Sequence, residues 1–467
     1  MRTQTLRRGL LAACVCALLA PAGASAAAST AEIEASVEKG VTYLKTLQQT
    51  GGGFASDWDL SALAAAHVAA ANVKKAGAET DARTWYRKLV GNTETWPGKE
   101  PVVTNYERAA LNAYAAGIDP ARVSKTQDLI AQIASYYEPA SPGYYGPIGN
   151  FNGTVFALLA LADTKTEGGV QRVPQALLNK SIEVVAKNQH TDGGWAWEKA
   201  EGNETKLKAA AEPDLTGAAM AALCTAGVSK SEGVLVKAKE YLEADLKAEA
   251  KGSGAFESEF GANTDSNAWA VSGLNACAIN PQEEGFTTKE KYTPIAFLIS
   301  QQLKSGVESG GFKYLTTGTT ANEYSSQDAI RALAGAGFTA TPPVPTGGLE
   351  QWFAESNFST SKTVKSPLAL IINNGTSTLK VCSVSVAPEA TTSTLEAVLK
   401  AAETGSTPKE CVTGHKSESA TKAITQINGY PSPPAPEWVL SIDGGAEEQA
   451  KTSKVIHLGD TIYLRLT

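Results

Sequence analysis

The stretch EPDLTGAAMAALCTAG, residues 212–227, decides the fold because its pattern recurs five more times along the chain. In every copy a polar residue, here named position k, is followed by Ala at k+3 and by a larger apolar residue at k+7. The k residues lie 46 to 62 residues apart and are Ser61, Glu107, Thr154, Thr216, Asn267 and Ser326. Such a period indicates a repeat architecture whose units bury their apolar faces on each other.

Each copy has the features of one helix. Positions k+3 and k+7 fall on the same helical face, and Ala at k+3 allows a neighbouring helix to approach closely. Two residues before k stands Asp or Asn in five copies, and we expect these residues to be N-caps. They are Asp59, Asn105, Asn152, Asp214 and Asp265, with Tyr324 in the sixth copy.

Between the copies lie amphipathic segments rich in Lys and Glu, whereas the copies themselves are rich in Ala and almost uncharged. This difference is typical of two concentric rings of helices, in which the inner ring is covered by the outer one. The sequence therefore predicts an (α/α)6 toroid of twelve helices over residues 31–338. All inner helices then begin at one end of the toroid and surround one mouth.

Charge and the N-terminal segment limit the functional classes. The net charge of −7 gives no electrostatic basis for nucleic-acid binding. Residues 1–26 combine three Arg, an apolar run and a small-residue cleavage site, as a secretory signal does. No later run approaches the ~20 apolar residues of a membrane helix. We expect an exported, secreted protein without a transmembrane segment in its mature chain.

Four cysteines follow the predicted signal peptide. Cys224 and Cys277 lie near the ends of neighbouring predicted helices, and Cys382 and Cys411 both lie in the C-terminal part. Because export makes disulfides plausible, we expect the pairs 224–277 and 382–411. The cysteines show no CxxC spacing and no clustering with His, so no zinc site is expected.

The composition changes after the toroid. Residues 339–361 read as a linker because TATPPVPTGG contains three Pro and two Gly in ten residues. Residues 362–467 are rich in Val, Thr, Ser and Ile with strand-like alternation, which predicts a small, mainly β domain. Strands are expected at 368–373, 379–386, 423–427, 437–442 and 461–466, with one helix at 391–402.

Both parts resemble known families. Predicted outer helices that end in Gln before Gly-Gly and an aromatic residue, as at Gln189 and Gly193-Gly194-Trp195, resemble the repeats of squalene cyclase-like terpene cyclases and of protein prenyltransferases. Residues 371–374, 391–402, 424–428, 437–441 and 459–462 resemble, in order and spacing, the C-terminal β-domain of transcobalamin and intrinsic factor. Those cobalamin carriers also place an (α/α)6 barrel before this domain, and in that family the ligand lies between barrel mouth and β-domain.

The resemblance implies a small-molecule-binding protein whose ligand, a cobalamin or other corrinoid, lies in the cleft between barrel mouth and β-domain. No other cofactor is expected. Polar residues at the mouth and aromatic or amide residues of the loops and the β-domain are the candidate ligand contacts. They are Asp214, Thr216, Asn267, Gln327, Tyr145, Asn373, Asn428 and Trp438.

Two alternatives stay open. Asp57-Trp58-Asp59-Leu60 matches two of the four positions of the DxDD acid of squalene-type cyclases, so a terpene cyclase or prenyltransferase-like enzyme with Asp57 or Asp59 as its acid is one alternative. A cell-surface module for glycan or protein recognition is the other. The sequence favours binding over catalysis because it shows no Ser-His-Asp order, no phosphate-binding loop and no acid-base pair. His67, at k+6, is expected to face the interior of the toroid.

Overall fold

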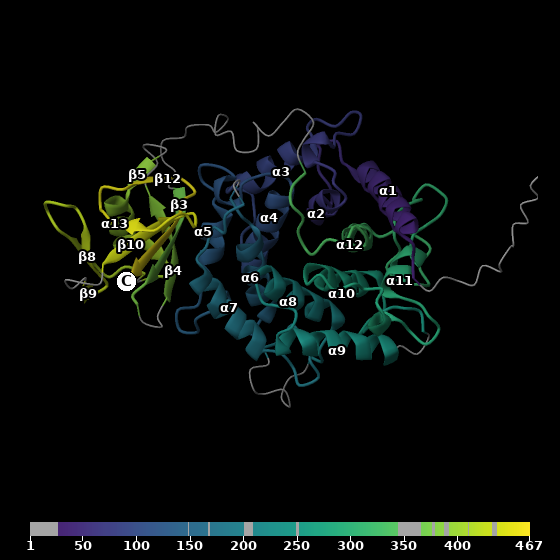
Figure 1. Ribbon diagram of the computed structural model, residues 1–467. Helices are drawn as coiled ribbons and strands as arrows, with labels where there is room; N and C mark the ends of the chain where they lie inside the picture. Colours follow the sequence, from purple (N-terminus) through teal and green to yellow (C-terminus); the bar gives the residue numbers. More distant parts are fainter. Residues whose placement is uncertain are drawn as a thin grey trace, which may run out of the picture.

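The computed structural model describes residues 27–147, 149–166, 169–199, 209–248, 252–343, 366–375, 379–386, 392–409, 411–431 and 437–467. The predicted signal peptide and residues 344–361 of the predicted linker lie outside these ranges. Within them the chain forms a helical body followed by a mainly β region (Figure 1). No helix of the described chain is both long and apolar enough to cross a membrane.

Outer and inner helices alternate along the helical body. The outer helices are α1 (Thr30–Leu47), α3 (Ala82–Gly91), α5 (Leu129–Ala134), α7 (Gln175–Lys187), α9 (Gly233–Ala248) and α11 (Pro294–Ser300). The inner helices are α2 (Trp58–Ala65), α4 (Val103–Ala115), α6 (Phe151–Asp163), α8 (Pro213–Thr225), α10 (Thr264–Ala276) and α12 (Glu323–Leu333). Each inner helix contains one copy of the repeated pattern, as the sequence predicts, except that α2 ends before Val68, the k+7 residue of its copy.

The inner helices close into a ring. Each inner helix contacts the next one in the order α2, α4, α6, α8, α10 and α12, and α12 in turn contacts α2. The first outer helix, α1, contacts both α11 and α12 and so closes the outer layer. All six Ala residues at k+3 are buried, which follows from their place between the two layers.

The tightest crossing in the ring joins α8 to α10. A Cβ atom on Gly217 would lie 2.3 Å from the carbonyl oxygen of Trp269, and one on Gly273 would lie 2.3 Å from that of Gly217. The backbones therefore touch at these glycines. The predicted disulfide Cys224–Cys277 joins the C-terminal ends of the same two helices, with an S–S distance of 2.03 Å.

The residues at position k anchor the turns that precede the inner helices. Their side chains accept a backbone N–H from the aromatic residue of the turn in four of the six copies. These pairs are Thr154 with Tyr145 at 3.2 Å, Thr216 with Trp195 at 3.1 Å, Asn267 with Phe256 at 3.2 Å and Ser326 with Phe312 at 2.8 Å. The repeated column is thus a structural device that holds each turn against its helix.

The C-terminal region is built on a six-stranded sheet with strand order β11-β10-β13-β3-β4-β6. All neighbours are antiparallel except β13 and β3. The sheet strands are β3 (Ser366–Asn373), β4 (Leu379–Val386), β6 (Ser406–Thr407), β10 (Trp438–Ile442), β11 (Glu448–Gln449) and β13 (Thr461–Leu466). Helix α13 (Leu395–Gly405) packs on β4, and the predicted disulfide Cys382–Cys411 is formed.

Short strands complete both regions. The β region adds β5 (Thr392–Thr394) paired with β12 (Val455–His457), and β7 (His415–Ser417), β8 (Ile424–Ile427) and β9 (Tyr430–Pro431) in a three-stranded sheet. A two-stranded hairpin, β1 (Glu257–Ser258) and β2 (Gly261–Ala262), precedes α10. The fold is therefore mixed, since the helical body also contains strands.

The sheet packs against the outer helix α5 of the toroid, on the left in Figure 1. Along β3, Leu368, Leu370 and Ile372 belong to the core of the β region, whereas Ala369 and Ile371 belong to the core of the toroid. Alternate side chains of a strand point to opposite faces, so both faces of β3 are buried.

An ionic network borders this interface. Arg172, which is 1% exposed, bridges Asp119 at 2.9 Å and Asp443 at 3.0 Å, and Arg122 pairs with Asp460 at 3.0 Å. Arg172 and Arg122 follow the C-terminal ends of α6 and α4, whereas the toroid mouth lies at the N-terminal ends of the inner helices. The β region is thus docked at the side of the toroid and away from the mouth.

Candidate functional site

In five of the six inner helices the N-cap lies two residues earlier than the sequence predicts, and in α4 it is Val102, three residues before Asn105. The side chain of Asn263 accepts from the backbone of Ser266 at 2.8 Å, and Asn322 accepts from Ser325 at 3.1 Å. Both asparagines stand at k−4. The prediction that the k−2 residues are the caps is therefore wrong, because each helix begins one half-turn earlier and places k−2 inside its first turn.

This shift places two of the k−2 residues, Asn152 and Asp265, on the lumen-facing side of their helices. Asp265 precedes Trp269 by four residues and Asn152 precedes Phe156 by four, so each pair shares a helical face. Trp269 and Phe156 contact each other in the lumen, with ring centroids 5.7 Å apart. We name the k−2 residues the mouth ring: Asp59, Asn105, Asn152, Asp214, Asp265 and Tyr324.

Several acceptor atoms of the mouth ring lack a hydrogen-bond donor. Asp59 is fully buried and accepts no N–H from the described residues, although the carboxyl of Glu323 shares a hydrogen bond with it. One side-chain oxygen of Asn152 and one of Asp265 have no partner among the described residues. Buried polar atoms without partners are rare in folded proteins. The mouth ring thus contains hydrogen-bond acceptor atoms that are available to a ligand.

Burial and mutual repulsion change the acidity of these carboxyl groups. Burial, aided by Glu323 and Asp57, raises the pKa of Asp59 well above its usual value. Burial and the charge of Asp328 raise the pKa of Asp265 to about 7, and burial raises the pKa of Asp214. Asp265 therefore exchanges its proton near neutral pH, and the raised pKa values of Asp59 and Asp214 favour their protonated forms.

A buried ion pair and four aromatic rings form the floor beneath the ring. Arg331, which is fully buried, donates to Asp328 at 2.8 Å, and its guanidinium lies 5.3 Å from the ring of Trp58 and 4.9 Å from that of Phe338. Its Nε and Nη1 have no partner among the described residues. Trp269 donates its indole N–H to Asp328 at 2.8 Å.

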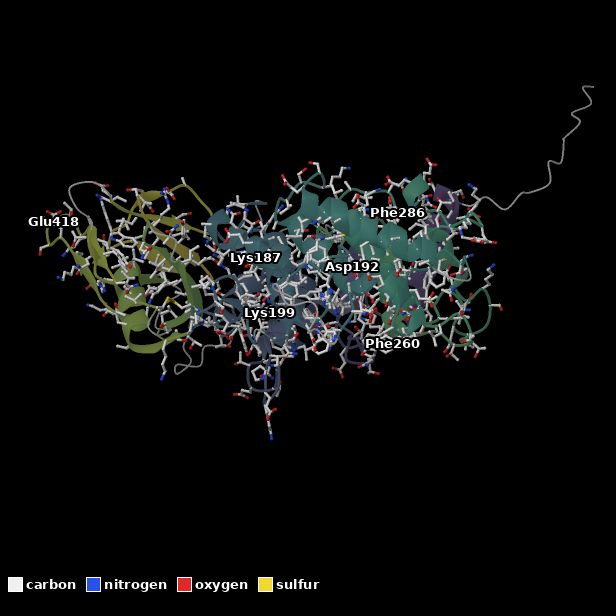
Figure 2. All side chains as sticks on the ribbon, turned by 90° about the horizontal axis from the view of Figure 1, so that it is seen from below. Lys187, Asp192, Lys199, Phe260, Phe286 and Glu418 are labelled. Carbon is white, nitrogen blue, oxygen red and sulfur yellow. A yellow bond between two sulfur atoms is a disulfide. The ribbon has the colours of Figure 1, made fainter. Side chains whose placement is uncertain are left out.

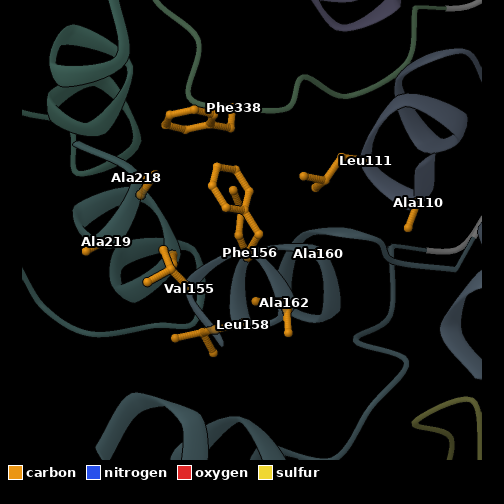
Figure 3. Close-up of a cluster of buried hydrophobic side chains, with 14 of the residues drawn as sticks. Ala110, Leu111, Val155, Phe156, Leu158, Ala160, Ala162, Ala218, Ala219 and Phe338 are labelled. Carbon is orange, nitrogen blue, oxygen red and sulfur yellow. The ribbon is translucent and has the colours of Figure 1, made fainter. Parts of the chain in front are cut away.

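Phe338 fills the centre of the lumen. Its ring lies 5.0 Å from Trp269, 5.8 Å from Phe156 and 6.5 Å from Trp58, and its carbonyl accepts from Ser61 at 2.7 Å. Figure 3 shows Phe156 pointing toward Phe338 from the opposite side. Sequence patterns could not identify this residue, because it follows the last helix and its role depends on the chain turning back into the ring.

The predicted ligand contacts of the toroid divide into two groups. Thr216 also donates to the carbonyl of Glu212 at 2.7 Å, and the amide of Asn267 donates to Pro294 at 3.0 Å, so both side chains are fully used inside the toroid. Tyr145 is buried against Tyr137, with centroids 5.4 Å apart. Asp214 belongs to the mouth ring, and Gln327 is buried near it with its carbonyl oxygen unpartnered.

The predicted contacts of the β region lie elsewhere. Asn373 donates to the Tyr463 hydroxyl at 3.2 Å, and Asn428 accepts from Thr413 and donates to the carbonyl of Cys411. Trp438 is 1% exposed and lies with Asn428 beside a hollow of about 50 Å³. The structure does not bring these residues to the mouth, because the apolar face of β3 and the Arg172 network hold the sheet on α5.

A larger hollow of about 280 Å³ lies at the junction of the two regions. Residues 171–175 of the toroid line one wall, and Ser441, Glu447 and Tyr463 of the β region line the other. Both regions contribute to this cleft, and none of the predicted ligand contacts lines it.

The structure also shows the surroundings of the two candidate acids and of His67. Asp57 accepts from the Tyr86 hydroxyl at 2.9 Å and pairs with Arg108 at 3.2 Å, so of the two candidate acids Asp59 is the unpaired one. His67 is exposed at the end of α2 with φ of 57°, which corrects the prediction that it faces the interior. No His, Cys, Asp or Glu cluster suited to a metal ion occurs within the described ranges.

No protein-family model and no curated protein matches the sequence. Among solved structures, haptocorrin in complex with Cbi is similar over 93% of this chain and 97% of its own, with 13% identity and a TM-score of 0.38. The type II terpene cyclase MstE from Scytonema is similar over 66% of this chain and 98% of its own, with 11% identity and a TM-score of 0.43. Both resemblances seen in the sequence recur here.

A glycosidase in complex with glucose is similar over 65% of this chain and 96% of its own, with 10% identity and a TM-score of 0.39. These TM-scores are all below 0.5, so no function is inferred from these structural similarities.

Proposed function

We propose that the protein is an exported, non-catalytic binding protein that holds a small molecule at the mouth ring. The single observation that supports this is the pair of buried acceptor atoms on Asn152 and Asp265 that have no donor among the described residues. Leaving such atoms buried without a partner costs roughly 1–3 kcal/mol each. A ligand with several N–H or O–H donors removes this cost and gains affinity from it.

A corrinoid is the first ligand to test. The sequence resemblance to cobalamin carriers points to it, and its peripheral carboxamides are N–H donors that match the acceptors of the ring. In the arrangement described above, the β region does not cover the mouth, so the toroid supplies the contacts. Whether the β region binds the same ligand is a separate proposal, for which the junction hollow is the place to look.

The test is calorimetry on the full mature chain with cyanocobalamin and cobinamide, joined to a thermal-shift screen of small polar metabolites. Asp265→Asn and Glu448→Gln each remove one carboxylate, the first from the mouth ring and the second from the distant strand β11. We expect a ligand that stabilises the wild type and Glu448→Gln but not Asp265→Asn. If every stabilising compound acts equally on both variants, the mouth is not the binding site.

Acid-initiated cyclisation of a polyprenyl substrate is the second candidate, and one observation favours it. Asp59 is a buried carboxyl with a raised pKa, next in sequence to Trp58, whose ring lines the lumen with Phe156 and Trp269. Such an acid must remain protonated in a dry site to protonate an alkene. Against it, Phe338 occupies the space that a polyprenyl chain needs.

Incubation with squalene and geranylgeranyl diphosphate, followed by mass spectrometry of the products, separates the two functions. Binding alone predicts unchanged substrates. If the wild type converts a substrate, and Asp59→Asn loses this activity while Asp57→Asn keeps it, the protein is a cyclase and the binding proposal is wrong.

A further inference from the structure

The hollow of about 280 Å³ at the junction of the two regions is separate from the mouth ring, none of whose residues lines it. Figure 2 shows the two regions side by side, with Lys187 in the toroid and Glu418 at the far end of the β region. Arg172 and Ser441 line the hollow with buried side chains, whereas Gln175 and Glu447 line it with exposed ones. The hollow therefore leads from solvent to a buried guanidinium.

Arg172 brings to this hollow a hydrogen-bond donor that has no acceptor. Its two terminal nitrogens donate to Asp443 at 3.0 Å and to Asp119 at 2.9 Å, which leaves the N–H of its Nε. The side chain is 1% exposed, and the Nε has no partner among the described residues. Because buried donors without acceptors are rare in folded proteins, this N–H points to an acceptor that enters the hollow.

Each of the two regions adds one further donor to the walls. Helix α7 begins at Gln175 and has no side-chain cap, and the backbone N–H of Gln175 has no acceptor within the described ranges. The uncapped start of a helix attracts negatively charged groups. On the opposite wall, the Tyr463 hydroxyl accepts from Asn373 at 3.2 Å, and its own hydrogen has no acceptor in the described part of the chain. The hollow thus offers three donors to one ligand.

The charges around the hollow nearly cancel. The described groups that line it or belong to the ionic network behind it are Arg122, Arg172, Arg465, Asp119, Asp128, Asp443, Asp460 and Glu447. Burial raises the pKa of Asp128 and of Asp460, which favours their neutral forms, and the other carboxylates are each paired with an arginine. The α7 start then favours one negative charge, whereas a doubly charged phosphate meets repulsion from the carboxylates.

We propose that the junction hollow binds a small organic acid, with one carboxylate on a short apolar body. The carboxylate accepts from the Nε of Arg172, the N–H of Gln175 and the hydroxyl of Tyr463. Hydrogen bonds from an arginine to a carboxylate are among the stronger ones in proteins. Val173 and Pro174, which also line the hollow, contact the apolar body. Such a ligand touches both regions and stabilises their docking.

The experiment compares two carboxylates with their uncharged amides on the full mature chain. Benzoate, benzamide, butyrate, butyramide and inorganic phosphate are titrated by calorimetry at neutral pH, and each is added in a thermal-shift assay. We expect at least one carboxylate to bind and to raise the melting temperature. Its amide and phosphate should bind at least about tenfold more weakly.

Two variants change the hollow and leave the Arg172 network in place. Tyr463→Phe removes one donor, and Gln175→Glu puts a carboxylate at the α7 start, where it repels the acid but stabilises the helix. Each should lower the affinity for the carboxylate at least about fivefold, and Gln175→Glu should not lower the melting temperature of the free protein. Gln49→Glu makes the same charge change at an exposed residue after α1 and should leave the affinity unchanged.

No binding of either carboxylate, or equal binding of acid and amide, overturns the inference. A carboxylate whose affinity falls in Asp265→Asn but not in Gln175→Glu binds at the mouth, which also overturns it. The proposed function at the mouth is judged by its own titration with corrinoids and polar metabolites, so either site can fail while the other stands.

Discussion

The indole N–H of Trp269 donates to one carboxylate oxygen of Asp328 at 2.8 Å, while the guanidinium of Arg331 occupies the other oxygen at 2.8 Å. One carboxylate thus joins α10 to α12 and neutralises a buried cation. Burial raises the pKa of Asp328, and the charge of Arg331 opposes that rise. The floor of the mouth depends on this carboxylate.

Removing the carboxylate leaves Arg331 buried without its counter-ion. We expect Asp328→Ala to lower the free energy of unfolding by about 3–5 kcal/mol, measured by chemical denaturation. The double variant Asp328→Ala/Arg331→Met removes both charges and should recover much of that loss. A single variant as stable as the wild type contradicts the buried pairing.

Thr216 tests the structural role of position k. Thr216→Val removes an acceptor from the Trp195 N–H and leaves that group buried, which should cost about 1–3 kcal/mol. Thr216→Ser keeps the hydroxyl and should lose much less. Thermal unfolding of both variants is the measurement, and equal melting temperatures would show that the turn is held by other contacts.

Asp265 makes stability depend on pH in a defined direction. Its pKa is about 7 in the folded protein against 3.8 for an unperturbed carboxyl, so the folded state binds more protons between these values. The stabilisation of the folded state by protonated Asp265 is complete below pH 3.8 and is lost as the pH rises through 7. We expect Asp265→Asn to flatten the decline in melting temperature from pH 5 to pH 8. An unchanged slope assigns the decline to other groups.

Arg172 tests the docking of the β region. Arg172 is 1% exposed and bridges Asp119 to Asp443, so Arg172→Ala removes a buried cation and leaves Arg122 as the remaining partner of both carboxylates. The cost should be up to about 3–5 kcal/mol. Arg465 pairs with Glu447 at the surface, so Arg465→Ala should cost at most about 1 kcal/mol. Denaturation followed by tryptophan fluorescence compares the two, and equal effects contradict the buried network.

The two disulfides should be present in exported protein. Peptide mass spectrometry without reduction should show Cys224 joined to Cys277, Cys382 joined to Cys411, and no alkylatable thiol in the mature chain. Replacing the first pair by Ser should lower stability by about 2–5 kcal/mol, by calorimetry. Free thiols in the native protein are the contrary result.

The sequence was informative wherever the pattern is local. The six hairpins, four of the six strands of the sheet and both disulfide pairs follow from spacing and composition, whereas the two-residue edge strands β6 and β11 were not predicted. Cap placement failed because Asn263 and Asp265 are both good cap residues, and only the direction of the incoming chain selects between them. The docking of the β region on α5 had a signal: the unbroken apolar run 368–372 is typical of a strand buried on both faces. Phe338 had none, because its contacts are all distant in sequence.

The glycine crossing and the disulfide give the ring an uneven stiffness. With backbone contact at Gly217 and Gly273 and a covalent bond beyond it, α8 and α10 form one rigid body, and the separation of Asp214 and Asp265 is fixed with them. Helix α2 has 8 residues against the 13 of α8 and α10, and it is the shortest inner helix that the structure describes. We expect any widening of the mouth to fall on the α2 side and to move Asp59. A ligand meets one pair of carboxyl groups at a set distance and a third that adjusts to its size.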